Sequence, residues 1–322
     1  MSFIVAITDY VFPSLEPERA VLESLGVELR PQQCRSEEEI IALAQDADAV
    51  LNCYAKMTAR VIENLKRCRI IARYGIGVDN VDLPAATRAG IVVSLAPGRN
   101  STAELAVGLM LAVMRRIPQS DRAMRNGEWP LVLGYVLKGK TLGILGLGKI
   151  GTEVAAIGRA FGMKVIAWGP TLTRERAAKS QATFMPLDDV LRTADVVSVH
   201  LKLSEQSKGL IDERRLHLMK KSAYFVNTAR GAIVDEQALV RVLADNAIAG
   251  AALDVFVEEP LPAKHPILEL DNVILTPHLG WPTDSGFEGF AENAVANILE
   301  YMDGKLTRAL NPEALQHRAK AG

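Results

Sequence analysis

Short apolar runs alternate with segments of helical spacing along the first hundred residues. The runs are four to six residues long, which is typical of strands that are buried on both faces. The segments between them repeat apolar residues three or four positions apart, as in a helix with one buried face. The expected strands are 3–8, 27–30, 48–52, 70–74 and 91–94, and the expected helices are 16–25, one from 36, 58–65 and 83–89. This order predicts a parallel sheet wound with helices.

A second series with the same alternation follows a break at "APGRNS" (96–101) and a strongly apolar helical segment over 102–116. Its expected strands are 141–145, 164–168, 196–200, 223–228, 249–255 and 272–278, with helices over 150–161 and 174–179. From Phe287 onward the helical spacing returns. We expect this last helix to pack back on the first sheet, which would make the first domain discontinuous.

Composition and charge favour a soluble globular protein with small-molecule partners. Of the 322 residues, 49% are hydrophobic, and the formal net charge is −1. Such a balance provides no basic surface for nucleic acid or an anionic membrane. Three well-separated cysteines, Cys34, Cys53 and Cys68, fit neither a disulfide framework nor a zinc site. We therefore expect no metal site. Because the cysteines suggest a reducing compartment and the N-terminal residues lack a basic leader, we expect a cytoplasmic protein.

The segment "GILGLGKIG" places Gly146, Gly148 and Gly151 in the G-x-G-x-x-G spacing. It follows an expected strand and opens an expected helix, which is the context in which this spacing binds a dinucleotide. The first glycine permits a tight turn, the second lets a pyrophosphate approach the backbone, and the third lets helix and sheet pack closely. The helix start at Lys149 and Ile150 then directs N–H groups at the phosphates.

Two doubly wound α/β domains are therefore expected. Residues 99–286 carry the glycine turn and are assigned to a Rossmann dinucleotide-binding domain, and residues 1–98 with 287–322 to a flavodoxin-like substrate domain. Ligands of such sheets bind beyond the carboxyl ends of the strands. We expect the active site in the cleft between the two domains.

The position that distinguishes NAD from NADP holds a glycine. About 20 residues after the glycine turn, NAD-binding domains usually carry an acidic residue that binds the ribose hydroxyls. Here "AWGPTLTRER" has Gly169 at that place, with Arg174 and Arg176 close behind. A glycine does not repel a 2′-phosphate, and an arginine fork suits one. We expect NADP to be modestly favoured over NAD; the alternative is that both arginines lie on a solvated helix start capped by Thr173.

Three charged or titratable residues follow successive strands of the second series. They are Arg230 in "NTARGAIVD", Glu259 in "VFVEEPLP" and His278 in "ILTPHLGW". A histidine can donate the proton that a ketone needs when hydride reduces it, and a neighbouring carboxylate favours the charged imidazolium. An arginine binds a carboxylate through two parallel hydrogen bonds. Taken singly, each residue has a structural alternative, such as a loop anchor or a strand-end histidine.

At these residues the sequence resembles the D-isomer-specific 2-hydroxyacid dehydrogenase family over nearly the whole chain. The resemblance includes "GLGKIG", "ADVVSVHLKLSEQSKGLI", "LMKKSAYFVNTARGAIVDEQAL", "GAALDVFVEEPLP" and "NVILTPHLG". It implies an oxidoreductase that interconverts a 2-keto acid and a D-2-hydroxy acid with NAD(P)(H). It further implies that His278 is the general acid/base, that Glu259 pairs with His278, and that Arg230 orients the substrate.

The resemblance also implies binding residues outside the glycine turn. Asp254 is expected to contact the nicotinamide amide. The segment "RYGIGVDNVD" is similar to the family's substrate loop, in which backbone N–H groups near Gly75, Ile76 and Gly77 receive the substrate carboxylate. The expected cofactor contacts beyond the glycine turn are Gly169, Arg174, Thr228, Ala229 and Asp254.

Two alternatives for the function stay open. One is phosphoglycerate oxidation, although the loop 52–58 lacks the arginine that such members tend to carry there, and Lys56 is its cation. The other is a non-catalytic dinucleotide-sensing protein, similar to corepressors that resemble this family. We also expect a homodimer, because the helix from Thr102 and the segment 129–133 offer more apolar surface than a connector needs.

Overall fold

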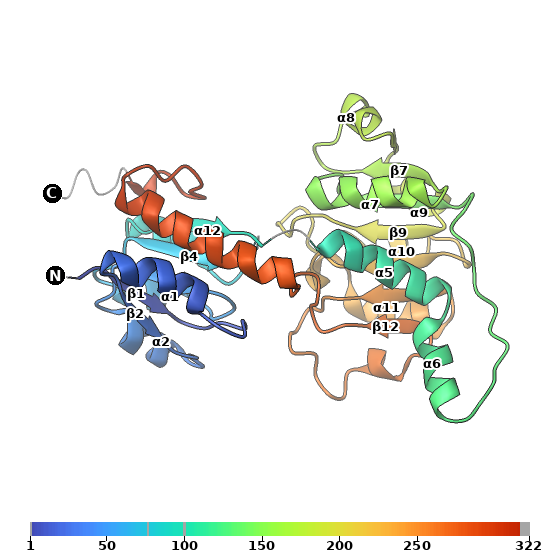
Figure 1. The fold of residues 1–322 in the computed structure, drawn as a ribbon. Coiled ribbons are helices and arrows are strands. Elements are labelled where there is room, and N and C mark those ends of the chain that lie inside the picture. The colour runs from blue at the N-terminus through green and yellow to red at the C-terminus, as the bar shows by residue number, and fades with distance from the viewer. Residues whose placement is uncertain (1, 76, 99–100, 316–322) are drawn as a thin grey trace. The chain divides into compact units, whose positions relative to one another are not determined.

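The computed structural model describes residues 2–75, 77–98 and 101–315 (Figure 1). The chain forms two compact units, residues 1–100 with 281–322 (unit 1) and residues 101–280 (unit 2). The division falls a few residues from the boundaries expected from the sequence. Each unit is a parallel sheet with helices on both faces, so the predicted α/β class is confirmed.

Unit 1 contains a five-stranded parallel sheet in the order β2-β1-β3-β4-β5. The strands are β1 (Ile4–Ile7), β2 (Glu28–Pro31), β3 (Ala49–Asn52), β4 (Ile70–Tyr74) and β5 (Val92–Ala96). The chain leaves β1 on one side to form β2 and returns on the other side to form β3. The topological switch point of this sheet therefore lies between β1 and β3.

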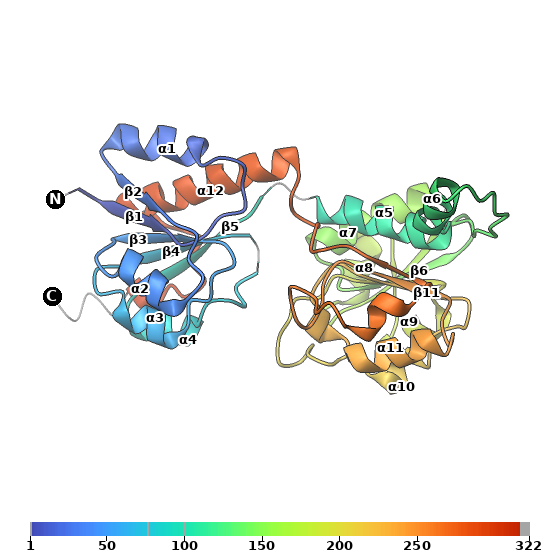
Figure 2. The same ribbon diagram turned by 90° about the horizontal axis from the view of Figure 1, so that it is seen from below.

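Helices cover both faces of the unit 1 sheet (Figure 2). The α1 and α12 helices pack on one face, and α2, α3 and α4 pack on the other. The helices are α1 (Glu16–Leu22), η1 (Glu23–Leu25), α2 (Glu37–Ala44), α3 (Ala59–Asn64), α4 (Leu83–Arg88) and α12 (Asp284–Met302). The return of the last helix to this sheet is confirmed by Asn297, whose side chain donates to the Leu95 carbonyl at 2.9 Å.

Unit 2 contains a seven-stranded parallel sheet in the order β12-β11-β10-β9-β6-β7-β8. The strands are β6 (Thr141–Leu145), β7 (Lys164–Trp168), β8 (Thr183–Phe184), β9 (Val196–Val199), β10 (Tyr224–Asn227), β11 (Gly250–Leu253) and β12 (Val273–Leu275). Its first six strands follow the order of dinucleotide-binding domains, with the switch point between β6 and β9.

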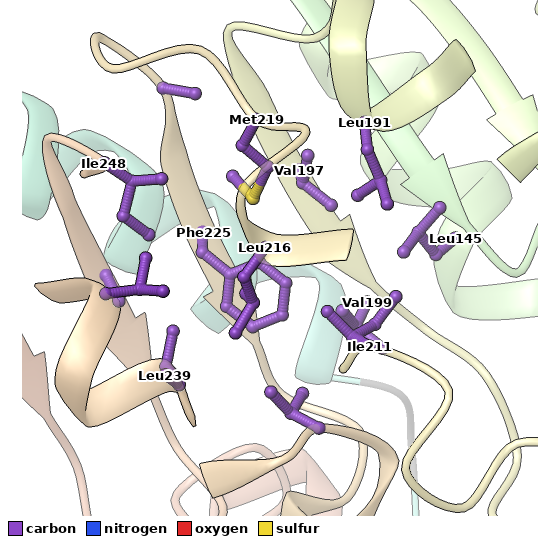
Figure 3. Close-up of a cluster of buried hydrophobic side chains, with 14 of the residues drawn as sticks. Leu145, Leu191, Val197, Val199, Ile211, Leu216, Met219, Phe225, Leu239 and Ile248 are labelled. Atoms are coloured by element: carbon purple, nitrogen blue, oxygen red, sulfur yellow. The ribbon is translucent and has the colours of Figure 1, made fainter. Parts of the chain in front are cut away.

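The helices of unit 2 also form two layers. The α5 and α7 helices pack on one face of the sheet, and α9, α10 and α11 pack on the other. Figure 3 shows the second layer, where Phe225 of β10 lies among aliphatic side chains such as Leu216 and Leu239. The helices are α5 (Thr102–Met114), α6 (Ile117–Arg125), α7 (Lys149–Ala160), α8 (Arg174–Lys179), α9 (Leu187–Thr193), α10 (Glu213–Leu216), η2 (Gly231–Ile233), α11 (Glu236–Ala244) and η3 (Pro266–Glu269).

The sequence patterns above do not predict α6, α9, α10 or α11. No residue of α6 is buried, so the helix has no apolar face that its sequence could show. Helix α10 is only four residues long, too short for a helical pattern to be recognised. In the described part of the chain, no helix has both the length and the apolar content needed to cross a membrane.

Candidate active site

Two glycines, one in the turn between β6 and α7 and one in the first turn of α7, are required by the fold. Gly146 has φ 101°, and a Cβ there would lie 2.6 Å from the carbonyl oxygen of His200. A Cβ on Gly151 would lie 2.1 Å from the carbonyl oxygen of Gly146. The turn, the helix start and the end of β9 therefore approach one another more closely than any side chain permits.

Gly148 differs from these two glycines. Its φ is −88°, which any residue adopts, and a Cβ there would meet nothing within 4 Å. It precedes the first turn of α7, where Lys149 and Ile150 contribute N–H groups that have no acceptor within the helix. A glycine that packing does not require, beside donors at a helix start, fits the approach of a pyrophosphate.

Gly169 follows β7 directly, next to the glycine turn. The Trp168 carbonyl accepts a hydrogen bond from the Gly146 N–H at 2.8 Å. A Cβ on Gly169 would lie 3.4 Å from the Leu172 Cβ, an ordinary contact, so a side chain fits there. The absence of an acidic residue at this place therefore has no steric cause.

The two arginines near Gly169 have different surroundings. Arg176 donates from Nη1 to the Thr171 carbonyl at 2.8 Å and so folds back on its own loop. Thr173 caps α8 by accepting from the Arg176 N–H at 3.2 Å. Arg174 is exposed, and within the described ranges it makes no hydrogen bond or ion pair. Of the two, Arg174 has the guanidinium that is not engaged by the protein.

His278 and Glu259 form a hydrogen-bonded pair beyond the ends of β12 and β11. The distance from His278 Nδ1 to Glu259 Oε2 is 2.8 Å, and Glu259 Oε1 accepts from the Phe256 N–H at 2.9 Å. Burial by itself raises the pKa of Glu259, but the hydrogen bonds from His278 and Phe256 and the charges of His278 and Arg230 outweigh it, so that its pKa is lowered. The ionised Glu259 accepts a hydrogen bond from the imidazole ring and so fixes the orientation of His278.

Asp254 holds the turn that carries His278. Its carboxyl group is fully buried; one oxygen accepts from the Leu279 N–H at 2.7 Å and the other from the Gly280 N–H at 2.9 Å. His278 itself has φ 56°, an uncommon conformation for a residue with a side chain, and its N–H donates to the Asp254 carbonyl at 2.9 Å. Burial raises the pKa of Asp254. This anchoring role was not predicted from the sequence, although an aspartate directly after a buried strand was a signal for it.

Arg230 lies beyond the end of β10 and close to Glu259. The Asn227 side chain donates to the Arg230 carbonyl at 3.0 Å, which shapes the turn after the strand. A Cβ on Gly231 would lie 2.1 Å from the Phe256 carbonyl carbon, so the loops after β10 and β11 touch through their backbones. The structure thus brings Arg230, Glu259 and His278 to one edge of the unit 2 sheet.

Thr228 and His200, also at this edge, differ in whether the protein itself satisfies their hydrogen-bonding groups. The Thr228 hydroxyl is buried and has no hydrogen-bond partner among the described residues, as a group reserved for a ligand would be, and Ala229 is half-buried beside it. His200 lies 2.8 Å from the Ser198 hydroxyl through Nε2, and burial lowers the pKa of His200 to about 4. At neutral pH His200 is therefore uncharged and has no imidazolium proton to donate.

The expected substrate loop belongs to unit 1. Gly75 has φ 117°, and its N–H already donates to the Ala96 carbonyl at 2.8 Å. Ile76 lies outside the described residues, and Gly77 is half-buried. Among the residues that the structure describes, no cluster of His, Cys, Asp or Glu could hold a metal ion.

Comparison with known proteins identifies the family. The model of the D-isomer specific 2-hydroxyacid dehydrogenase NAD binding domain matches residues 107–280. Rat D-3-phosphoglycerate dehydrogenase is 41% identical over 309 residues, which cover 94% of this chain but only 58% of that protein. The glyoxylate reductase of Aeropyrum pernix is 42% identical over 284 residues, which cover 84% of each chain. The crystal structure of a glyoxylate reductase from Paecilomyes thermophila has a TM-score of 0.87 at 32% identity, over 97% of this chain and 99% of that one.

The family model covers more than half of the chain, and the relatives exceed 40% identity. The predicted resemblance is confirmed. The two parallel sheets, the glycine turn and the Arg230, Glu259 and His278 edge belong to an NAD(P)-binding oxidoreductase: the chain is an enzyme of the D-isomer specific 2-hydroxyacid dehydrogenase family.

Proposed function

We propose that this chain reduces a small 2-keto acid to the D-2-hydroxy acid, and runs the reverse reaction, with His278 as the general acid/base. The observation that supports this best is the 2.8 Å pair of His278 Nδ1 and Glu259 Oε2, with Arg230 held beside it. The nicotinamide cofactor, when bound, supplies the hydride. The groups that would hold it are the first-turn N–H groups of α7, the Thr228 hydroxyl and the edge near Asp254.

The protein's own groups handle the proton and the substrate carboxylate. The Nδ1–H of His278 donates to Glu259, which fixes the orientation of the ring and leaves Nε2 for the substrate. The other ring nitrogen, Nε2, gives its proton to the carbonyl oxygen as hydride reaches the carbon, and takes it back in the reverse direction. Arg230 pairs with the substrate carboxylate. General acid help of this kind is typically worth about 10² to 10⁴ in rate.

The substrate that we propose is glyoxylate or hydroxypyruvate, with no phosphate. Residues 52–58, at the end of β3 and in the loop that follows it, contain no arginine, and Lys56 is the one cation among them. We expect kcat/KM for hydroxypyruvate to exceed that for its 3-phosphate by about tenfold or more. A panel of 2-keto acids, assayed with NADPH and with NADH, tests the proposal. No turnover on any of them would favour a protein that only senses the dinucleotide.

For the cofactor we propose a modest preference for NADP. Gly169 carries no acidic side chain that would repel the 2′-phosphate, and the exposed Arg174 is the first residue of α8, five positions further along. For the assembly we propose a homodimer. The segment after α6 has neither helix nor strand over 128–138 and exposes Trp129, Leu131 and Leu133, a set of apolar side chains that a second copy would cover. Sedimentation of the wild type and of Leu131→Glu tests the dimer.

A further inference from the structure

The switch point of unit 1 is occupied by one of the protein's own carboxylates. In doubly wound sheets ligands bind beyond the carboxyl ends of the strands at the switch point, which here lies between β1 and β3. Asp9 follows β1 by two residues, and residues 53–56 follow β3 directly. The Asp9 side chain is only 8% exposed. A buried carboxylate at this place needs an explanation, because burying such a group is costly unless it is hydrogen-bonded.

Three consecutive N–H groups converge on the Asp9 carboxylate. Oδ1 accepts from the Cys53 N–H at 3.0 Å, and Oδ2 accepts from the Tyr54 N–H and, at 3.1 Å, from the Ala55 N–H. The Thr8 hydroxyl adds a further hydrogen bond to Oδ1 at 2.9 Å. Successive backbone N–H groups of this kind form a concavity for an anion. In this unit the anion is part of the chain.

The network extends to a second loop through two asparagines. Asn52 is fully buried, and its side chain accepts a hydrogen bond from the Asn80 side chain at 2.8 Å. Asn80 also donates to the Ala55 carbonyl at 3.0 Å, and its own carbonyl accepts from the Met57 N–H at 2.8 Å. The loop after β3 and the end of the loop after β4 are therefore one hydrogen-bonded body centred on Asp9 and Asn52.

Two side chains of this loop extend to the surface. Tyr54 is 41% exposed, Lys56 is exposed, and both extend from a backbone that is held from below. A buried polar network is seldom more stable than apolar packing of the same volume, but it orders one geometry. The free-energy cost of burying Asp9 and its partners is therefore explained if the loop must hold one orientation to bind its ligand.

We propose that Asp9 is a positioning residue for substrate binding. It fixes the backbone of residues 53–55 and, through Asn52 and Asn80, the end of the loop after β4. The substrate then meets Tyr54 and Lys56 in one orientation. This inference rests on the proposed function, since it assumes that a 2-keto acid is bound at these loops.

The variant Asp9→Asn tests the inference at nearly constant size. It replaces one acceptor oxygen by an NH₂ group that faces backbone N–H donors, so the loop loses its geometry. We expect KM for the preferred 2-keto acid to rise by about tenfold. We expect kcat and the Kd of NADPH, measured by fluorescence, to stay within about twofold, because the cofactor-binding groups and His278 belong to unit 2.

Asp48→Asn is the matched control at the opposite edge of the same strands. Asp48 precedes β3, accepts from the Ile4 N–H at 2.9 Å and pairs with Arg67 at 2.7 Å. This variant should lower the melting temperature without changing KM. The inference is overturned if a folded Asp9→Asn enzyme keeps its KM, or if Asp48→Asn raises KM equally. If Asp9→Asn does not fold, Asn80→Ala must raise KM instead. A wild-type enzyme without turnover would defeat the proposed function, and this inference with it.

Discussion

Each unit has a topological switch point, which is open in unit 2 and filled by a side chain in unit 1. In unit 2, between β6 and β9, the glycine turn leaves space: a Cβ on Gly148 would meet nothing within 4 Å. In unit 1, between β1 and β3, the corresponding point is filled by Asp9, which accepts hydrogen bonds from residues 53–55. Both points present backbone N–H groups to an anion. In unit 1 the anion is the Asp9 side chain, and in unit 2 we propose that it is a phosphate of the cofactor.

The difference shows that fold topology locates a binding edge but does not decide whether it is available. Parallel strands bring backbone donors to the carboxyl edge of either sheet. A glycine beside those donors leaves them for a ligand, whereas an aspartate satisfies them permanently and makes the loop rigid. Availability is therefore decided by one or two side chains at each switch point.

If the open edge of unit 2 carries the proton transfer, His278→Gln should have the largest effect of the variants proposed. Glutamine has no titratable proton, so kcat should fall by about 10² to 10⁴ while the cofactor still binds. Stopped-flow or steady-state assays with NADPH measure it. His265→Gln is the matched control, because His265 pairs with Glu236 at 3.3 Å in the same unit. Comparable losses in both variants would remove His278 from its assigned role.

Gly169→Asp sharpens the comparison by placing a carboxylate beside the open switch point. A Cβ fits at this position, so the fold should not change. The aspartate would repel the 2′-phosphate and accept hydrogen bonds from the ribose of NAD. The ratio of kcat/KM for NADPH to that for NADH should fall by about ten- to a hundredfold. An unchanged ratio would mean that the selectivity lies elsewhere in the loop.

Gly148→Ala and Gly146→Ala separate space kept for a ligand from space needed by the fold. Gly148→Ala should leave the melting temperature unchanged and raise the Kd of the cofactor by about tenfold, because the methyl group enters otherwise open space. Gly146→Ala should be destabilised by roughly 1–3 kcal/mol, since φ is 101° and the methyl group meets the His200 carbonyl. Calorimetry and cofactor titration measure both. Equal loss of stability in the two variants would contradict the distinction.

Glu18→Gln gives the smallest effect and concerns a second buried carboxyl group of unit 1, which backbone N–H groups do not surround as they surround Asp9. Glu18, on α1, is 1% exposed; one oxygen accepts from the Tyr74 hydroxyl at 2.9 Å, and the other is buried without a partner among the described residues. Burial raises the pKa of Glu18. Between the ordinary glutamate pKa and this raised pKa, the folded state keeps a proton that the unfolded state has lost. The stability of the wild type therefore falls as the pH rises through this range.

Glutamine carries no charge, so Glu18→Gln avoids this loss. At pH 7 the free energy of unfolding of this variant should exceed that of the wild type by on the order of 1 kcal/mol. The difference between the two free energies should vanish near pH 4. Urea unfolding at the two pH values measures it. A difference that did not depend on pH would show that the Glu18 carboxyl is not the titrating group.

The sequence predicted much of the fold because local patterns carried the information. The strands over 70–74 and 164–168 and the helix over 174–179 have the bounds expected from apolar runs and turn residues. The edge with Arg230, Glu259 and His278 was also predictable, since each residue lies in the loop that follows a strand of one parallel sheet. Helix α6 was not, because none of its side chains faces a core.

The sequence by itself determined the two parallel sheets, the glycine turn and the chemical types at the active edge, all of which follow from spacing along the chain. Only the tertiary structure decided which N–H groups are engaged. Asp9 binds residues 44 to 46 positions away, and the Gly75 amide donates to a neighbouring strand. Such bonds depend on which loops the sheet order brings together and on how side chains turn when packed. Spacing along the chain contains neither.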